Sequence, residues 1–180
     1  TALGANTLSS HTTASNNTAL GYAAMNTNST GGNNTAVGYY ALMANTTASD
    51  NTGVGYRALR SNTTGTSNVA VGYDTLRVST TESNNTAVGY RAVEENTGGY
   101  SNTGLGSEAL RENTTGLKNT AVGAGALFAN TTGNNNVAMG RNALDAATGA
   151  NNNTAIGTES MTANTTGTHN AALGYATMES

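Results

Sequence analysis

The sequence has no cysteine, no proline and no tryptophan, and only one phenylalanine. Without cysteine the chain forms no disulfide scaffold, no thiolate zinc site and no cysteine nucleophile. Only 9% of the residues are charged, against about 25% in an ordinary soluble domain. The net charge of −3 gives no basic surface for nucleic acid. No apolar run approaches the roughly 20 residues that cross a bilayer, so we expect no membrane insertion.

Few side chains remain that could do chemistry. The two histidines, His11 and His169, are single departures in polar columns of the repeat described below, and we interpret them as solvated turn residues. The carboxylates show no Asp-x-Asp calcium-loop spacing, and the glycines show no Gly-Lys-Ser/Thr phosphate loop. We therefore expect no catalytic residue, no metal site, no cofactor and no enzymatic activity.

What the sequence has in abundance is asparagine, threonine and glycine, arranged in a strict repeat. It contains 27 Asn, 33 Thr and 23 Gly in 180 residues. The string Asn-Thr-Ala-Val-Gly recurs with its glycine every 17 residues and with no insertion or deletion. We call these glycines the glycine row: Gly4, Gly21, Gly38, Gly55, Gly72, Gly89, Gly106, Gly123, Gly140, Gly157 and Gly174. A strict period indicates that each copy is one identical structural unit.

Two columns of the repeat are always large and apolar, and we predict that they form the core. The strand-apolar row directly precedes each glycine and includes Val37, Val54, Val71, Val88 and Val122. The leucine row lies four residues after each glycine and includes Leu42, Leu59, Leu76, Leu110 and Leu127. Neighbouring side chains in a strand point to opposite faces. The small residue two before each glycine, the alanine row, must therefore face away from the valines.

This alanine row includes Ala36, Ala70, Ala87 and Ala121. A strand that faces water carries polar groups on its outer side, so alanine there indicates burial on both faces. Either a second chain or the opposite wall of a flat coil must lie against it. We take the alanines as the candidate interface between chains.

An asparagine column four residues before each glycine predicts a hydrogen-bonded ladder, because stacked amides bond to one another in parallel arrays. Its central members are Asn34, Asn51, Asn68, Asn85, Asn102 and Asn119. The second half of most repeats reads as Asn-Thr-Thr-Gly or a close variant, which is typical of a turn beside a short extended segment.

These rows predict an all-β parallel solenoid, a β-roll or β-helix, of about 10.5 coils with two or three short strands in each coil. Helical repeats run to about 33 residues or more, and Thr, Asn and Gly form helices poorly. We treat residues 1–180 as one solenoid domain, expected to be a fragment of a longer fibrous protein or a subunit of a filament.

Two further columns lie on the expected surface. The tyrosine row directly follows the glycine, and we mark Tyr39, Tyr56, Tyr73 and Tyr90 as a candidate surface patch, either packed as a stack or presented to sugar rings. Of the 17 charged residues, 13 lie between Asp50 and Lys118. In the column two residues after the glycine, the charge alternates in sign from coil to coil, at Arg57, Asp74, Arg91 and Glu108. This alternation predicts a ladder of surface ion pairs.

The unit Asn-Thr-Ala-Val-Gly-Tyr-x-Ala-Leu resembles repeats of phage tail-fibre proteins and of large bacterial surface proteins. Its Ala-Val-Gly-x-x-Ala core is also similar to the head repeats of trimeric autotransporter adhesins, although those repeats are shorter. The resemblance implies a left-handed β-roll packed as a homotrimer and an extracellular location, on a cell surface or a virion.

The sequence therefore predicts a structural segment of an extracellular or virion fibre or filament, acting as shaft or adhesive head. The partners expected are other copies of the chain, as a homotrimer or an end-to-end filament, and a possible cell-surface glycan. The alternative is a solenoid that binds ice or glycans through its Thr/Asn columns, such as Thr46 and Thr63, or its tyrosines. An acyltransferase solenoid is disfavoured because 17 is not a multiple of that fold's six-residue unit.

Overall fold

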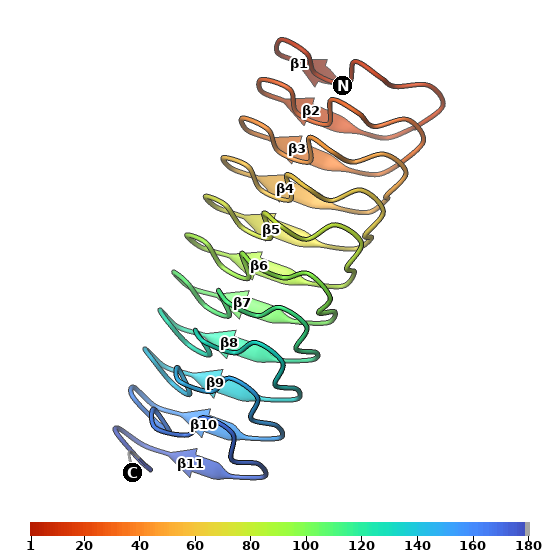
Figure 1. The fold of residues 1–180 in the computed structure, drawn as a ribbon. Coiled ribbons are helices and arrows are strands. Elements are labelled where there is room, and N and C mark those ends of the chain that lie inside the picture. Colours follow the sequence, from red (N-terminus) through yellow and green to blue (C-terminus); the bar gives the residue numbers. More distant parts are fainter. Residues whose placement is uncertain (179–180) are drawn as a thin grey trace.

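The computed structural model describes residues 1–178 and shows an all-β parallel solenoid (Figure 1). Short strands lie one behind the next along one side of a rod, with β1 at one end and β11 at the other. The strands are β1 (Ala2–Leu3), β2 (Thr18–Leu20), β3 (Thr35–Val37), β4 (Thr52–Val54), β5 (Val69–Val71), β6 (Thr86–Val88), β7 (Thr103–Leu105), β8 (Thr120–Val122), β9 (Val137–Met139), β10 (Thr154–Ile156) and β11 (Ala171–Leu173). One 17-residue repeat makes one coil, as predicted.

The coils stack in a constant register. Every strand pairs in parallel with the next, and each residue lies opposite the residue 17 positions later, as Val37 lies opposite Val54. Backbone hydrogen bonds join the coils at other points of the circumference too. Leu42 N donates to Ala58 O at 3.0 Å, and Asp50 N donates to Gly32 O at 3.1 Å.

Within residues 1–178 each coil has only one strand, whereas the sequence predicts two or three. The paired threonines do not alternate their hydrogen bonds as a strand does. The N–H groups of Thr46 and Thr47 both donate to the carbonyl of Thr63, at 3.1 and 3.4 Å. Before them, the backbone turns twice through left-handed conformations, at Tyr40 (φ 59°) and Leu42 (φ 50°). The chain there bends too sharply to form a strand.

The glycine row is required by close contact between coils. Gly72 has φ +139°, a conformation that L residues rarely adopt, and a Cβ added to it would lie 2.1 Å from the carbonyl oxygen of Gly89. The same contact recurs from coil to coil. This explains why the column accepts no other residue.

The leucine row forms the core, as predicted. Its members between Met25 and Met161 are completely buried. They hold left-handed backbone angles, as Leu59 does at φ 51°. Such a conformation costs about 1–2 kcal/mol per residue. Burying the side chain returns about 1.5–3 kcal/mol, so the packing of this row offsets its strain.

The prediction that the strand-apolar row lies in the core is wrong. Its valines are half-exposed on the outside of the rod, and Val88 is 37% exposed. The corrected residues are Val37, Val54, Val71, Val88 and Val122. The alanine row points inward instead: Ala36, Ala70, Ala87 and Ala121 are 0% exposed.

The reason is the thinness of the coil. A Cβ built on Gly53, a member of the alanine row, already lies 3.3 Å from Cγ of Leu42. Only a small residue fits between the strand and the leucine row, so the alanines face the opposite wall of their own flat coil. They are not available as an interface between chains.

The predicted asparagine ladder is present and fully buried from Asn34 to Asn153. Its side chains bond mainly to backbone. Oδ1 of Asn34 accepts from the N–H of Asn51 at 2.9 Å, and Nδ2 of Asn51 donates to the carbonyl of Gly65 at 2.8 Å. Each amide therefore ties one coil to the next and also spans its own coil.

A second asparagine ladder, seven residues after the glycine, was not predicted. Its amides bond directly to one another, as Asn45 Nδ2 does to Asn28 Oδ1 at 2.8 Å and Asn130 Nδ2 does to Asn113 Oδ1 at 2.7 Å. The column is less regular in the sequence than the first, because His11, Ser79 and Ala147 interrupt it. The Thr-Thr-Gly that follows this column predicts a turn, but the structure buries its asparagine side chains, among them Asn45 and Asn62.

Candidate functional surface

One exposed strip runs along the strand side of the rod. We call the outer strip the three rows that face outward there: the strand threonines three residues before each glycine, the strand-apolar row, and the tyrosine row. Among the exposed large apolar residues of this strip are Leu20, Val88, Leu105, Met139 and Ile156, which are 37% to 43% exposed. A strip of partly exposed apolar side chains with this regularity is typical of a contact surface.

The tyrosine row is a continuous stack over five coils. The ring centroids of Tyr22, Tyr39, Tyr56, Tyr73 and Tyr90 follow one another at 5.3, 5.4, 4.9 and 5.4 Å, with interplanar angles of 7° to 19°. These rings cover one another's faces and present their edges and hydroxyl groups to solvent. The predicted stack is therefore present. A platform for sugar rings would need the covered faces, so this geometry gives little support to glycan binding.

The phenols of this stack influence one another. A hydrogen bond with Tyr40, partial desolvation and the neighbouring phenols together raise the pKa of Tyr39 to about 12. The guanidinium of Arg57 lies 4.8 Å from the ring centroid of Tyr56, and that of Arg91 lies 5.1 Å from the centroid of Tyr90. Both are cation–π contacts within the usual range.

The predicted ladder of alternating charges is present in part. Nε of Arg57 donates to Asp74 at 2.7 Å, and this hydrogen bond raises the pKa of Arg57. Farther along the rod the alternating pairs give way to a cluster of three arginines around Glu94. Its carboxylate lies 2.9 Å from Arg77, 3.4 Å from Arg111 and 3.8 Å from Arg91. Asp74 and Glu94 are nearly buried, so these ion pairs fasten coils together.

The two threonine arrays differ in what their hydroxyl groups do. The first array is the column of Thr46 and Thr63, which the sequence offers for ice binding. Its hydroxyls already donate to carbonyls of the next coil. Thr46 Oγ1 donates to Thr63 O at 3.1 Å, and Thr63 Oγ1 donates to Thr80 O at 3.0 Å. The strand threonines, among them Thr35, Thr52 and Thr86, are partly exposed. Within residues 1–178 their hydroxyls have no hydrogen-bond partner.

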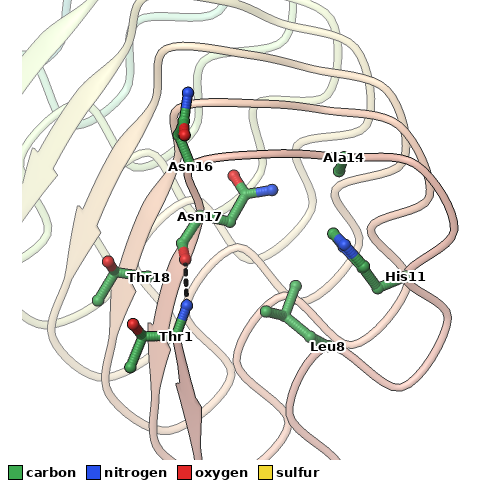
Figure 2. A pocket seen from close by; sticks show the side chains of 7 residues that line it. All are labelled: Thr1, Leu8, His11, Ala14, Asn16, Asn17 and Thr18. Carbon is green, nitrogen blue, oxygen red and sulfur yellow. Dashed lines mark hydrogen bonds between the residues drawn. The ribbon is translucent and has the colours of Figure 1, made fainter.

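A cavity of about 340 Å³ lies at the β1 end of the rod (Figure 2). Among its lining residues are Leu8, His11 and Asn17, and the N-terminal amine of Thr1 donates to the carbonyl of Asn17 at 2.7 Å. Leu8 belongs to the leucine row, which the neighbouring coils cover elsewhere. The cavity is thus the inner side of the first coil, and His11 is exposed there as predicted.

The second histidine, His169, is also exposed, with Nε2 3.4 Å from Nδ2 of Asn152. Across the described part of the chain, no three His, Asp or Glu side chains are grouped so as to hold a metal ion. The same residues include no helix long and apolar enough to span a membrane.

Compared with protein-family models, with curated proteins and with solved structures, the chain matches none of them. The function is therefore argued from the geometry of the rod itself.

Proposed function

We propose that this chain is a structural segment of an extracellular or virion fibre or filament, serving as its shaft or adhesive head. The observation that carries the proposal is the constant 17-residue register through every contact between coils. In a solenoid each repeat contacts only its neighbours, so added repeats lengthen the rod without altering its cross-section. This property suits a part whose task is to span distance.

The outer strip supports association of such rods with one another. The alanine row is buried inside the coil, so the exposed apolar rows of the outer strip are the candidate interface between chains instead. Three parallel copies, as the adhesin resemblance implies, or a filament of rods would each cover part of this strip.

The length dependence gives a direct test. A variant in which residues 35–102, four repeats, are duplicated should fold into a rod longer by about 19 Å and of unchanged width, at about 4.8 Å per coil. Electron microscopy of negatively stained particles measures both dimensions. The matched control duplicates residues 35–101, one residue fewer, which breaks the register and should lower stability. An unchanged length in the full duplication would contradict the proposal.

The location is tested separately. Antibodies raised against the rod should label appendages on intact source cells or virions in immunogold microscopy. Label confined to the interior of lysed cells would contradict an extracellular fibre.

A second candidate is binding to ice by the outer strip. The observation in its favour is the row of strand threonines with unbonded hydroxyls beside a regular apolar row. Thermal hysteresis of the purified protein is the measurement, and Thr86→Lys, Thr103→Lys and Thr120→Lys together should abolish it. No hysteresis in the unsubstituted protein removes this candidate.

A further inference from the structure

The outer strip is asymmetric along the rod, and its two halves are complementary in size. From the second to the sixth coil the tyrosine row carries bulky rings, at Tyr22, Tyr39, Tyr56, Tyr73 and Tyr90. In the next four coils the same row carries Ser107, Ala124, Arg141 and Thr158. The tyrosines therefore raise the surface over one half of the rod and leave it low over the other.

The two halves also differ in charge. Residues 1–81 carry three arginines and two carboxylates, a net charge of +1. Residues 82–178 carry seven carboxylates and four basic residues, a net charge of −3. Two rods side by side and parallel would place like halves together, tyrosines beside tyrosines and the acidic ends beside each other. Two antiparallel rods would place each half against its complement.

We propose that two copies of this chain pair face to face and antiparallel through their outer strips. The two-fold axis lies parallel to the strands and passes between β5 and β6. Such an axis keeps each row opposite its own counterpart and reverses the order of the coils. The pairing goes beyond the proposed function: it takes the place of a parallel three-fold contact through the same strip, and it does not bear on whether the rod is a fibre segment.

This axis brings complementary residues together in the third and fourth coils, while at the centre Tyr73 lies opposite the partner's Tyr90. Tyr56 lies opposite the partner's Ser107, and Tyr39 lies opposite the partner's Ala124. Arg57 lies opposite the partner's Glu108, and both side chains are partly exposed. The strand-apolar row meets apolar residues throughout, with Val71 opposite the partner's Val88 at the centre. An interface in which the same surface serves both subunits is the commonest form of homodimer.

The size of the contact is adequate. Ten facing coils at about 4.8 Å give a length of about 48 Å, and four residues across at about 3.4 Å give a width of about 14 Å. The product is on the order of 700 Å² per copy, against about 800 Å² per partner in stable complexes. A strip of this area, with an apolar centre, threonines along one margin and charged residues along the other, fits a second copy of the chain.

Light scattering gives the first test. The rod should have a mass near twice 18.0 kDa. Val88→Lys introduces two charges at the centre of the contact and should shift the mass to that of one chain. Val88 already faces outward, so the fold should persist, which far-UV circular dichroism verifies. Thr64→Lys lies on the exposed Thr-Thr segment away from the strip, and this control should stay paired.

Distances between spin labels test the direction. The chain has no cysteine, so Thr64→Cys and Thr166→Cys each create one labelling site. In the antiparallel pair the two labels at position 64 are offset along the rod by about three coils, or about 14 Å, and those at position 166 by about nine coils, or about 43 Å. The second distance should be clearly the longer.

Equal distances at the two positions, a mass near three chains, or a monomer would each overturn the pairing. None of these results bears on whether the rod lengthens when repeats are added. Pairing also covers the strand threonines, so a stable pair and ice binding by the same strip exclude each other.

Discussion

The hydroxyl of Ser79 donates a hydrogen bond to Oε2 of Glu82 at 2.9 Å, inside a coil where the neighbouring repeats carry asparagine and glycine at these two positions. The same carboxylate oxygen accepts from the N–H groups of Thr80 at 2.6 Å and Thr81 at 3.0 Å. The glutamate thus folds back into the space of the missing asparagine amide. The substitution leaves one defect, because Oδ1 of Asn62 is buried without a partner.

The contact between Ser79 and Glu82 predicts strong coupling between these two residues in a double-mutant cycle. Glu82→Gly alone leaves the N–H groups of Thr80 and Thr81 unpaired, and Ser79→Asn alone forces an amide against the carboxylate. Each should lower the free energy of unfolding by about 1–3 kcal/mol. The double variant restores the second ladder and should be at least as stable as the parent. Urea unfolding of the four proteins measures the coupling, and additive effects would contradict the pairing.

The same glutamate should make stability depend on pH. Burial by itself raises the pKa of Glu82, but the hydrogen bonds from backbone N–H groups and from Ser79 outweigh it, and the pKa is lowered below 4.5. A carboxyl whose pKa is lower in the folded state stabilises the fold above its unfolded pKa and loses that contribution as the pH falls through the folded value. The parent should therefore lose more stability below pH 4.5 than the Ser79→Asn, Glu82→Gly variant, in parallel melts across that range.

The second ladder has another gap, at Ala147. Oδ1 of Asn130 points toward that position and is buried without a partner. Ala147→Asn should supply the missing donor and raise the free energy of unfolding by about 1 kcal/mol. The matched opposite change, Asn113→Ala, removes the bonds from Asn113 Nδ2 to Asn96 Oδ1 and from Asn130 Nδ2 to Asn113 Oδ1, and should cost about 1–3 kcal/mol. Thermal melts compare the two, and a loss of stability in Ala147→Asn would show that the site lacks room.

The glycine row should be intolerant of any side chain. Gly72→Ala brings a Cβ to 2.1 Å from the carbonyl of Gly89 at φ +139°, and the coils must separate to relieve it. We expect a loss of at least about 3 kcal/mol, since strain and broken coil contacts add. Gly149→Ala is the control, because its nearest neighbour is the Thr132 hydroxyl at 3.4 Å and its φ is not positive. A small effect of Gly72→Ala would mean that the coils are less tightly stacked.

The tyrosine stack should be visible in a spectrophotometric titration. Tyr39 should ionise near its raised pKa of about 12. Replacing the phenol that raises it, by Tyr40→Phe, should bring the pKa of Tyr39 down toward 10. Because the folded pKa lies above the unfolded one, the stabilising contribution is complete below pH 10 and is lost as the pH rises toward 12. Identical titrations of the two proteins would contradict this arrangement.

The strict 17-residue repeat is the reason that much of this fold could be predicted from the sequence. In a strict 17-residue repeat every column has one environment, so the glycine row, the leucine core and the first asparagine ladder could be identified from residue type alone. An apolar column in phase across the chain predicts burial, and this reasoning is right for Leu59 but wrong for Val71, whose column is just as regular and faces outward. Asn51 had to bond along the stack, because a buried amide needs partners.

Other properties were decided only by the tertiary structure. Both Ala70 and Val71 are apolar neighbours on one strand, and the sequence does not say which of them faces the interior. The thickness of the coil settles it, because the leucine row leaves room for a methyl group and no more. The second ladder also depends on three-dimensional contact. In the sequence, Ser79 and Glu82 are two unrelated departures from the repeat. In the folded coil they act together, because the Glu82 carboxylate accepts hydrogen bonds where other coils have an asparagine amide.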